Sequence, residues 1–215
     1  MGVVYDQVAC RDRLRQGAIR LGVALDETQE QQLLQFLALL VKWNRAYNLT
    51  AVREPLEMVG RHLLDSLAVL PHLQGRRCLD MGTGPGLPGI PLAIMRPEME
   101  FVLLDSNGKK IRFVRQVVLE LGLANVGLEH LRVEAYQQDL PFDTLIARAF
   151  TSLPRMLELT GHLRSANGVL LAMKAEKVDR ELTALGQGFE TRIIPLEVPF
   201  TEGKRCLIEV TAVSG

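Results

Sequence analysis

Hydrophobic residues change their spacing about a third of the way along this chain. Before that point they recur every three or four positions, as in Leu33, Leu37 and Leu40, which is typical of amphipathic helices. After it, short apolar runs alternate with helical patterns. We therefore expect a helical extension over residues 1–74, followed by one compact α/β domain over residues 75–215.

Two helices are predicted within the extension. The first begins at an N-cap, which is either Asp26 or Thr28. The second runs over residues 55–70 and starts at Pro55, because proline suits the first position of a helix. The polar residues 44–53 between them are interpreted as turn-like.

Strand and helix patterns alternate through the rest of the chain. The expected strands cover residues 77–81, 101–105, 125–129, 142–147, 168–174, 192–198 and 205–213. The expected helices cover residues 90–95, 109–121, 152–163 and 176–185, and Gly122 is the expected stop of the second of these. This alternation predicts a parallel sheet covered on both faces. The short loop between the last two strands predicts an antiparallel hairpin at one edge.

A glycine-rich turn, Asp80–Gly89, follows the first of these strands and opens a helix. Gly84, Gly86 and Gly89 have the Gly-x-Gly-x-x-Gly spacing. Glycine permits positive φ and close approach of a ligand, and the helix start offers unpaired N–H groups. A tight structural turn has the same glycines. Asp105 favours a nucleoside cofactor, because it ends the next strand about 20 residues further on, where a ribose-binding acid is expected.

The acid of this turn, Asp80, indicates which cofactor to expect. A fixed negative charge is unfavourable beside the pyrophosphate of a dinucleotide, whereas it is favourable beside the ammonium and sulfonium groups of S-adenosyl-L-methionine (AdoMet). The order Asp-x-Gly-x-Gly-x-Gly, which starts at Asp80, is the form of this site in class I methyltransferases. We therefore expect AdoMet rather than NAD.

The composition is that of an ordinary globular protein, with 47% hydrophobic and 23% charged residues in 215. The formal net charge of zero counts against a large basic face for bare nucleic acid, so RNA binding would need local clusters or recognition of shape. No apolar run is long enough to span a bilayer, and residues 1–15 lack the apolar region of a signal peptide. The three cysteines lack metal-binding spacing. We expect a cytoplasmic protein with reduced thiols, no metal site and no membrane association.

The glycine loop continues with a second Pro-Gly, Pro88-Gly89. Further motifs along the chain are Leu104-Asp105-Ser106 with Lys109-Lys110, Arg132-Val133-Glu134, Ala147-Arg148-Ala149-Phe150, Asn44, Tyr47 to Val52, and His62 with Asp65-Ser66-Leu67. Together these motifs resemble those of the bacterial RsmG (GidB) family of rRNA methyltransferases. The match covers nearly the whole chain and is weakest in its last third.

The resemblance implies a seven-stranded, Rossmann-like class I AdoMet-dependent methyltransferase domain with helices added at its N-terminus. It implies methyl transfer from AdoMet to N7 of one guanosine in the decoding region of 16S rRNA, as free rRNA or within the 30S ribosomal subunit. We expect a monomer, since no long apolar seam requires a partner. The cofactor contacts that it implies are Gly82, Leu87, Val133, Glu134 and Arg148, with Asp105 as the ribose partner and Gly84 in the same loop.

Three of these cofactor residues have a structural alternative. Asp105 could cap the following helix instead of binding ribose. Glu134 could be an exposed loop acid instead of a partner for the adenine amine. Arg148 follows the fourth strand, where it could contact the methionine carboxylate, contact the incoming base or form a surface ion pair.

Polar side chains of the extension are the candidates for substrate binding, namely Asn48, Thr50, His62, Asp65 and Ser66. Helical spacing places His62, Asp65 and Ser66 on neighbouring turns of one face. Alternatively, these three hydrogen-bond to Asn48 and Thr50 and fasten the extension to the domain. Their spacing along one helix does not suit a Ser-His-Asp nucleophile set.

Basic and aromatic side chains supply the remaining substrate candidates. Lys109 and Lys110 begin a basic helix near the expected cofactor mouth, where they either contact phosphates or form a solvated face. Tyr47 and Phe150 are candidates for base stacking, whereas Trp43 is expected in the core.

No residue is expected to act as a catalytic acid or base. Guanine N7 carries a lone pair and no proton, so alignment with the methyl donor is sufficient. The chain also lacks the Asp/Asn-Pro-Pro-Tyr box and the Pro-Cys nucleophile that other base methyltransferases carry after the fourth strand. The alternatives are a methyltransferase acting on a small molecule or protein, an AdoMet-binding RNA module without turnover, and an NAD oxidoreductase.

Overall fold

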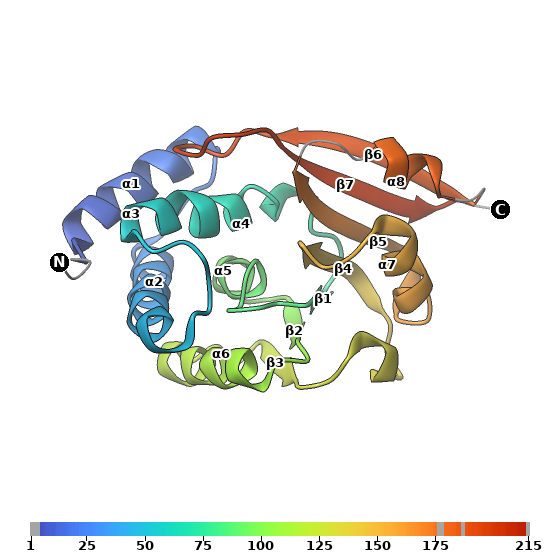
Figure 1. The fold of residues 1–215 in the computed structure, drawn as a ribbon, viewed down its shortest axis with the longest axis horizontal. Coiled ribbons are helices and arrows are strands. Elements are labelled where there is room, and N and C mark those ends of the chain that lie inside the picture. The colour runs from blue at the N-terminus through green and yellow to red at the C-terminus, as the bar shows by residue number, and fades with distance from the viewer. Residues whose placement is uncertain (1–4, 176–178, 186–187, 214–215) are drawn as a thin grey trace.

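The N-terminal part of the protein is a group of helices, shown in blue to cyan in Figure 1. The computed structural model describes residues 5–175, 179–185 and 188–213. The helices of the extension are α1 (Gln7–Arg20), α2 (Glu27–Tyr47), α3 (Pro55–Met58), the π-helix η1 (Val59–Leu64), α4 (Asp65–Leu67) and the 3-10 helix η2 (Leu70–His72).

Helix α2 begins where the sequence predicts it. The Asp26 side chain accepts a hydrogen bond from the Gln29 N–H, and the Gln29 side chain accepts one from the Asp26 N–H, which forms a capping box. Helix α1 was not among the predicted elements. Asp6 caps it, and Arg15 on its surface forms an ion pair with the buried Glu30 of α2.

The helix predicted over residues 55–70 changes its pitch along its length. It starts at Pro55 in α3, passes through the π-helix η1 and ends with α4 at Leu67. A π-turn holds one extra residue per turn. Gly60 lies in this turn, and a Cβ there would be 3.1 Å from the carbonyl oxygen of Phe200. The change of pitch accompanies the packing of a segment distant in sequence, which a hydrophobic period does not reveal.

In the part of the chain that the structure describes, seven strands form one mixed sheet in the order β3-β2-β1-β4-β5-β7-β6. The strands are β1 (Arg77–Met81), β2 (Glu100–Leu104), β3 (Val126–Glu129), β4 (Phe142–Arg148), β5 (Arg164–Ala175), β6 (Phe189–Leu196) and β7 (Arg205–Ala212). The pairs among β1 to β5 are parallel, and β7 is antiparallel to both β5 and β6. The predicted seven-stranded α/β fold with an antiparallel hairpin at one edge is confirmed.

Several predicted boundaries differ from the structure. Strand β5 begins at Arg164, earlier than predicted, because its pairing with β4 resumes after a register shift between Phe142 and Thr144. Strand β6 covers Phe189–Leu196 instead of residues 192–198. The predicted helix over residues 176–185 corresponds to α8 (Asp179–Thr183), and residues 176–178 lie outside the described residues.

Helices cover both faces of the sheet (Figure 1). The remaining ones are α5 (Gly89–Met95), α6 (Gly108–Leu121), the short η3 (Val133–Ala135) and α7 (Leu153–Thr160). Alternate strand residues divide between two cores: in β2, Phe101 and Leu103 pack with α5, α6 and the extension, whereas Val102 and Leu104 pack on the face of α7. The extension therefore shares one continuous core with the α/β domain. Among the described residues, no helix has the length and apolar character needed to cross a membrane.

Candidate active site

The glycine loop lies at the point where the strand order reverses. Strand β1 pairs with β2 on one side and with β4 on the other, so the connections leave it in opposite directions. In open α/β sheets, ligands bind at the carboxyl ends of the strands beside such a point. The loop between β1 and α5, the end of β2 and the end of β4 therefore meet where a ligand is expected.

Three glycines give the loop a backbone path that other residues rarely adopt. Gly82, Gly84 and Gly86 have φ values of 66°, 60° and 84°. The N–H groups of Gly82 and Thr83 donate to the Leu104 carbonyl at 2.8 and 3.0 Å, which holds the loop against the end of β2. A Cβ at Gly84 would have no described atom closer than 3.8 Å, so the surface there is open.

Asp80 fastens the loop from inside the protein. Its Oδ2 accepts hydrogen bonds from the Thr83 hydroxyl at 2.6 Å and from the Gly89 N–H at 2.9 Å, so one carboxylate ties the two ends of the loop. Burial raises the pKa of Asp80 to about 6, although these two hydrogen bonds favour the charged form. Its Oδ1 is buried without a hydrogen-bond partner among the described residues.

Asp105 is placed at the carboxyl end of β2, as predicted for a ribose-binding acid. Its Oδ2 accepts from the Gly84 N–H and its Oδ1 from the Asn107 N–H, both at 2.8 Å. The alternative role as a helix cap is wrong, because Asn107 is the N-cap of α6. The Lys110 Nζ lies 4.0 Å from Asp105 Oδ2, which places Lys110 beside the glycine loop.

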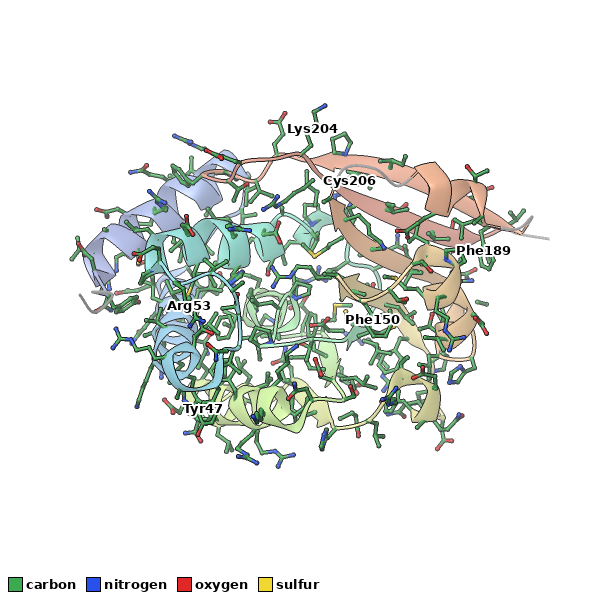
Figure 2. The ribbon with its side chains drawn as sticks, in the orientation of Figure 1. Tyr47, Arg53, Phe150, Phe189, Lys204 and Cys206 are labelled. Atoms are coloured by element: carbon green, nitrogen blue, oxygen red, sulfur yellow. The ribbon has the colours of Figure 1, made fainter. Side chains whose placement is uncertain are left out.

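Phe150, which follows β4 after Ala149, contacts the same glycine loop. Ala149 has a φ of 50°, a left-handed conformation that is uncommon for residues other than glycine. The ring of the next residue, Phe150, covers Gly82, and a Cβ there would be 2.7 Å from Phe150 Cδ2. Phe150 lies near the centre of the view in Figure 2.

The other cofactor residues implied by the resemblance are more scattered. Leu87 and Val133 are buried, at 2% and 1% exposure, and Val133 belongs to η3 beyond the end of β3. Glu134 is exposed and lies 3.7 Å from the guanidinium of Arg155, so its carboxylate has a partner at the surface.

Part of the polar cluster of the extension forms a hydrogen-bond network between the end of α2 and the loop that follows it. The Thr50 N–H donates to the Asn44 side chain at 2.9 Å, and the Asn44 amide donates to the Val52 carbonyl. Asn48, at the left-handed C-cap of α2, accepts from Arg53 at 2.7 Å. These hydrogen bonds all join residues of the extension, so they order its polar loop and do not themselves fasten the extension to the α/β domain.

His62, in the π-helix η1, joins this hydrogen-bond network through Thr50. Its Nδ1 lies 2.9 Å from the Arg61 carbonyl, which can only accept, so Nδ1 carries the proton and Nε2 accepts from the Thr50 hydroxyl at 2.9 Å. Burial and then the charge of Arg148 lower the pKa of His62 to about 4, so the ring is neutral. Ser66 is fully buried and donates to the His62 carbonyl, so its hydroxyl is not presented to a substrate.

Asp65 joins the extension to the sheet through two arginines. Its Oδ1 accepts from Arg205 Nε at 2.8 Å, and its Oδ2 accepts from Arg148 Nη1 at 3.3 Å. Arg148 also donates to the Arg61 carbonyl at 3.1 Å. Arg205 was not singled out in the sequence, because the first residue of an edge-hairpin strand carries no local pattern that marks it.

These residues line a pocket of about 410 Å³ at the carboxyl ends of β4 and β5. We call it the two-arginine pocket, and its polar wall includes Thr50, Arg61, His62, Asp65, Arg148, Lys174 and Arg205. The structure thus brings three predicted substrate-binding residues, Thr50, His62 and Asp65, together with Arg148. The other predicted substrate-binding residues, Asn48, Ser66, Lys109 and Lys110, do not line the pocket.

Tyr47 is exposed at the end of α2, and Figure 2 shows it on the same side of the molecule as Arg53. Its ring lies 5.2 Å from that of Trp43, which in turn lies 5.6 Å from the ring of Phe113 in α6. Trp43 thus has the predicted packing role, while Tyr47 is 46% exposed.

Comparisons with known proteins match almost the whole chain. The family model GidB, described as rRNA small subunit methyltransferase G, matches residues 29–208. The ribosomal RNA small subunit methyltransferase G of Shewanella amazonensis is 50% identical over 200 residues, which is 93% of this chain and 97% of that protein. The protein of the same name from Ectopseudomonas mendocina is 54% identical over 202 residues, covering 92% and 94%.

Solved structures share the fold at low sequence identity. A methyltransferase from Geobacter sulfurreducens has a TM-score of 0.59 at 20% identity and covers 93% of this chain and 96% of its own. A putative methyltransferase from Streptococcus mutans, solved in complex with SAH, has a TM-score of 0.51 at 14% identity and covers 70% and 96%.

Proposed function

The chain belongs to the rRNA small subunit methyltransferase G family, and we propose that it transfers a methyl group from AdoMet to N7 of a guanosine in the decoding region of 16S rRNA. The observation that carries this proposal is the family match over residues 29–208, with about half of all positions identical across more than nine tenths of both chains. The glycine loop at the switch point supports it, because it is built for a nucleoside cofactor.

The residues present fit AdoMet. The buried Asp80 Oδ1, which has no hydrogen-bond partner among the described residues, suits a cationic ligand. The open surface at Gly84 admits a ligand close to the backbone. When bound, AdoMet would supply an electrophilic methyl group on a sulfonium. Asp105 would accept from the ribose hydroxyls, the backbone at Val133 would meet the adenine ring, and Glu134 would reach its amine from the rim. Leu87 would contact the cofactor from the glycine loop.

The residues of the chain would align the guanine with the methyl donor and would not transfer a proton. Guanine N7 has a free lone pair, so its reaction with a methyl electrophile requires alignment and no base. His62, which lines the two-arginine pocket, has both ring nitrogens engaged, which agrees with an architectural role. Phe150 would stack on the guanine beside the glycine loop, and backbone carbonyls would stabilise the positive charge that develops on the base.

We further propose that the protein is a cytoplasmic monomer whose substrate is small-subunit RNA, free or assembled in the 30S subunit. A target inside a folded RNA must leave its stack to reach the loop. Lys109 and Lys110 at the start of α6 would contact phosphates near the cofactor mouth.

Transfer of labelled methyl from AdoMet to small-subunit RNA that lacks its N7 methylation tests the proposal, with naked RNA and 30S particles as parallel substrates. We expect label at a single guanosine, located by chain cleavage at N7-methylguanine. Label on neither substrate, with AdoMet binding intact, would reject rRNA and leave a small molecule or protein as the substrate.

The variant Asp105→Ala tests the cofactor site. Hydrogen bonds to a charged group contribute about 1.5–3 kcal/mol, so we expect AdoMet affinity to fall roughly ten- to hundred-fold in calorimetric titrations. Asp139→Ala, at an exposed loop position, is the matched control and should bind AdoMet as the unmodified protein does. Equal affinity in both variants would remove Asp105 from the cofactor site.

A further inference from the structure

The two-arginine pocket has more positive than negative charge. Among the described residues, four cationic side chains line it, namely Arg61, Arg148, Lys174 and Arg205, against the single carboxylate of Asp65. Lys174 is already paired, because its Nζ lies 2.9 Å from Glu181 and 2.7 Å from the Thr151 carbonyl. Asp65 is shared by two guanidinium groups, so it can neutralise only one of them.

The arginines keep donors for a ligand. A guanidinium carries five N–H donors, and the hydrogen bonds to Asp65, to the Arg61 carbonyl and from Arg205 to the Glu202 carbonyl use a minority of them. The side chains of Arg148 and Arg205 are each 22% exposed, so solvent or a ligand reaches them. Because Asp65 holds both, their planes are fixed before a ligand arrives, and fixed guanidinium groups suit the oxygens of a phosphate.

The pocket adjoins the glycine loop through a single short segment. Arg148 and Ala149 line the pocket, and Phe150 lies against Gly82. Arg148 and Phe150 are two Cα steps apart, at most about 7.6 Å, which is the scale of one nucleotide. The left-handed Ala149 lies between them, so the same turn serves both sites. A chain with its phosphate in the pocket would therefore present its base to the loop.

We propose that the two-arginine pocket binds a backbone phosphate of the RNA next to the guanosine that is methylated. This inference rests on the proposed function and adds an anion site to it. It gives a chain of zero net charge a local means of holding RNA, since the cations are concentrated where the substrate backbone must lie. It also assigns Arg205 to the substrate and Asp65 to the positioning of Arg205 and Arg148.

Two variants separate this role from folding. Arg205→Ala removes one guanidinium and leaves Asp65 paired with Arg148. Arg61→Ala removes an exposed side chain for which no ion pair is found among the described residues. The matched control is Arg76→Ala, an exposed arginine at the opposite ends of the strands. Each protein is titrated, without a methyl donor, into unmethylated 30S subunits and a fragment of small-subunit RNA at several salt concentrations.

Both pocket variants are expected to bind RNA about ten-fold more weakly, and the slope of log K against log salt should fall by about 1 for each phosphate that the variant no longer neutralises. Arg76→Ala should match the unmodified protein. Slopes and affinities equal in all four proteins would overturn the proposal, as would binding by the unmodified protein that does not depend on salt. A loss of AdoMet affinity in Arg205→Ala with unchanged RNA binding would assign the pocket to the cofactor instead.

The binding titrations contain no turnover step, so they separate this inference from the proposed function. Pocket-dependent RNA binding without methyl transfer would retain the anion site and remove the N7 reaction. Methyl transfer with RNA binding that does not depend on the pocket would retain the N7 reaction and remove the anion site. Free phosphate that competes equally with RNA in the unmodified protein and in Arg205→Ala would likewise remove the pocket as the phosphate site.

Discussion

Asp80 shapes the glycine loop through one of its two carboxylate oxygens. Oδ2 holds Thr83 and Gly89, and Oδ1 is buried without a hydrogen-bond partner among the described residues. From the sequence, an acid before the first glycine predicts a cationic cofactor. The sequence could not indicate the structural function, which depends on how the loop folds back on β1.

The raised pKa of Asp80 makes part of the stability depend on pH. Its pKa is about 6 in the folded protein against 3.8 for a free side chain, so the folded state binds the proton more tightly. The contribution is therefore largest below about pH 4 and is lost as the pH rises through 6. The difference corresponds to roughly 3 kcal/mol.

Asp80→Asn keeps an acceptor for Thr83 and Gly89 but cannot ionise. Measured by urea unfolding from pH 4 to pH 7, the free energy of unfolding of the unmodified protein should decline relative to that of Asp80→Asn. Parallel profiles for the two proteins would show that Asp80 does not titrate in this range.

The π-helix η1 and the loop before α3 act as one element because His62 joins them. Its ring must stay neutral to accept from Thr50. The folded pKa of about 4 lies below the 6.5 of a free histidine, so this contribution is fully present above pH 6.5 and is lost as the pH falls through 4. It changes with pH in the opposite direction to the contribution of Asp80.

His62→Gln tests the element, since glutamine can accept from Thr50 without a proton equilibrium in this range. As the pH falls from 6.5 to 4, the unmodified protein should lose roughly 3 kcal/mol of unfolding free energy relative to the variant. His130→Gln, at an exposed position, should show no such difference. A relative loss of the same size in His130→Gln would attribute the effect to general histidine charging.

Elements with strong end signals could be predicted from the sequence, and elements that depend on distant packing could not. Asp26 and Gly122 mark the ends of α2 and α6 by local chemistry: Gly122 was the predicted stop, and Asp26 was one of the two predicted N-caps. The π-turn at Gly60 accompanies contact with the Phe200 backbone, far along the chain, and was missed. The site follows the same rule: the glycine loop and Asp105 could be located, whereas Arg205 joins Asp65 only through the tertiary fold.

The whole molecule is expected to unfold as one unit, because the extension and the α/β domain share a core. Trp43, the single tryptophan of the chain, reports on this boundary, since its ring in α2 packs 5.6 Å from Phe113 of α6. Its fluorescence therefore monitors the contact between the two parts directly.

Unfolding by urea, followed by Trp43 fluorescence and by far-UV circular dichroism, should give the same midpoint. Phe113→Leu, which weakens the contact, should lower both midpoints equally. A fluorescence midpoint at lower urea than the dichroism midpoint would instead show that the extension separates first, and would support two independent units divided near residue 74.

Strand β7 has a consequence for how the protein is made. It follows β6 along the sequence but is an interior strand of the sheet, between β5 and β6. Until β7 has emerged from the ribosome, one edge of β5 has no paired strand. An unpaired strand edge is a site of aggregation. Arg205 opens this strand, so a nascent chain acquires the full wall of the two-arginine pocket only after β7 has been synthesised.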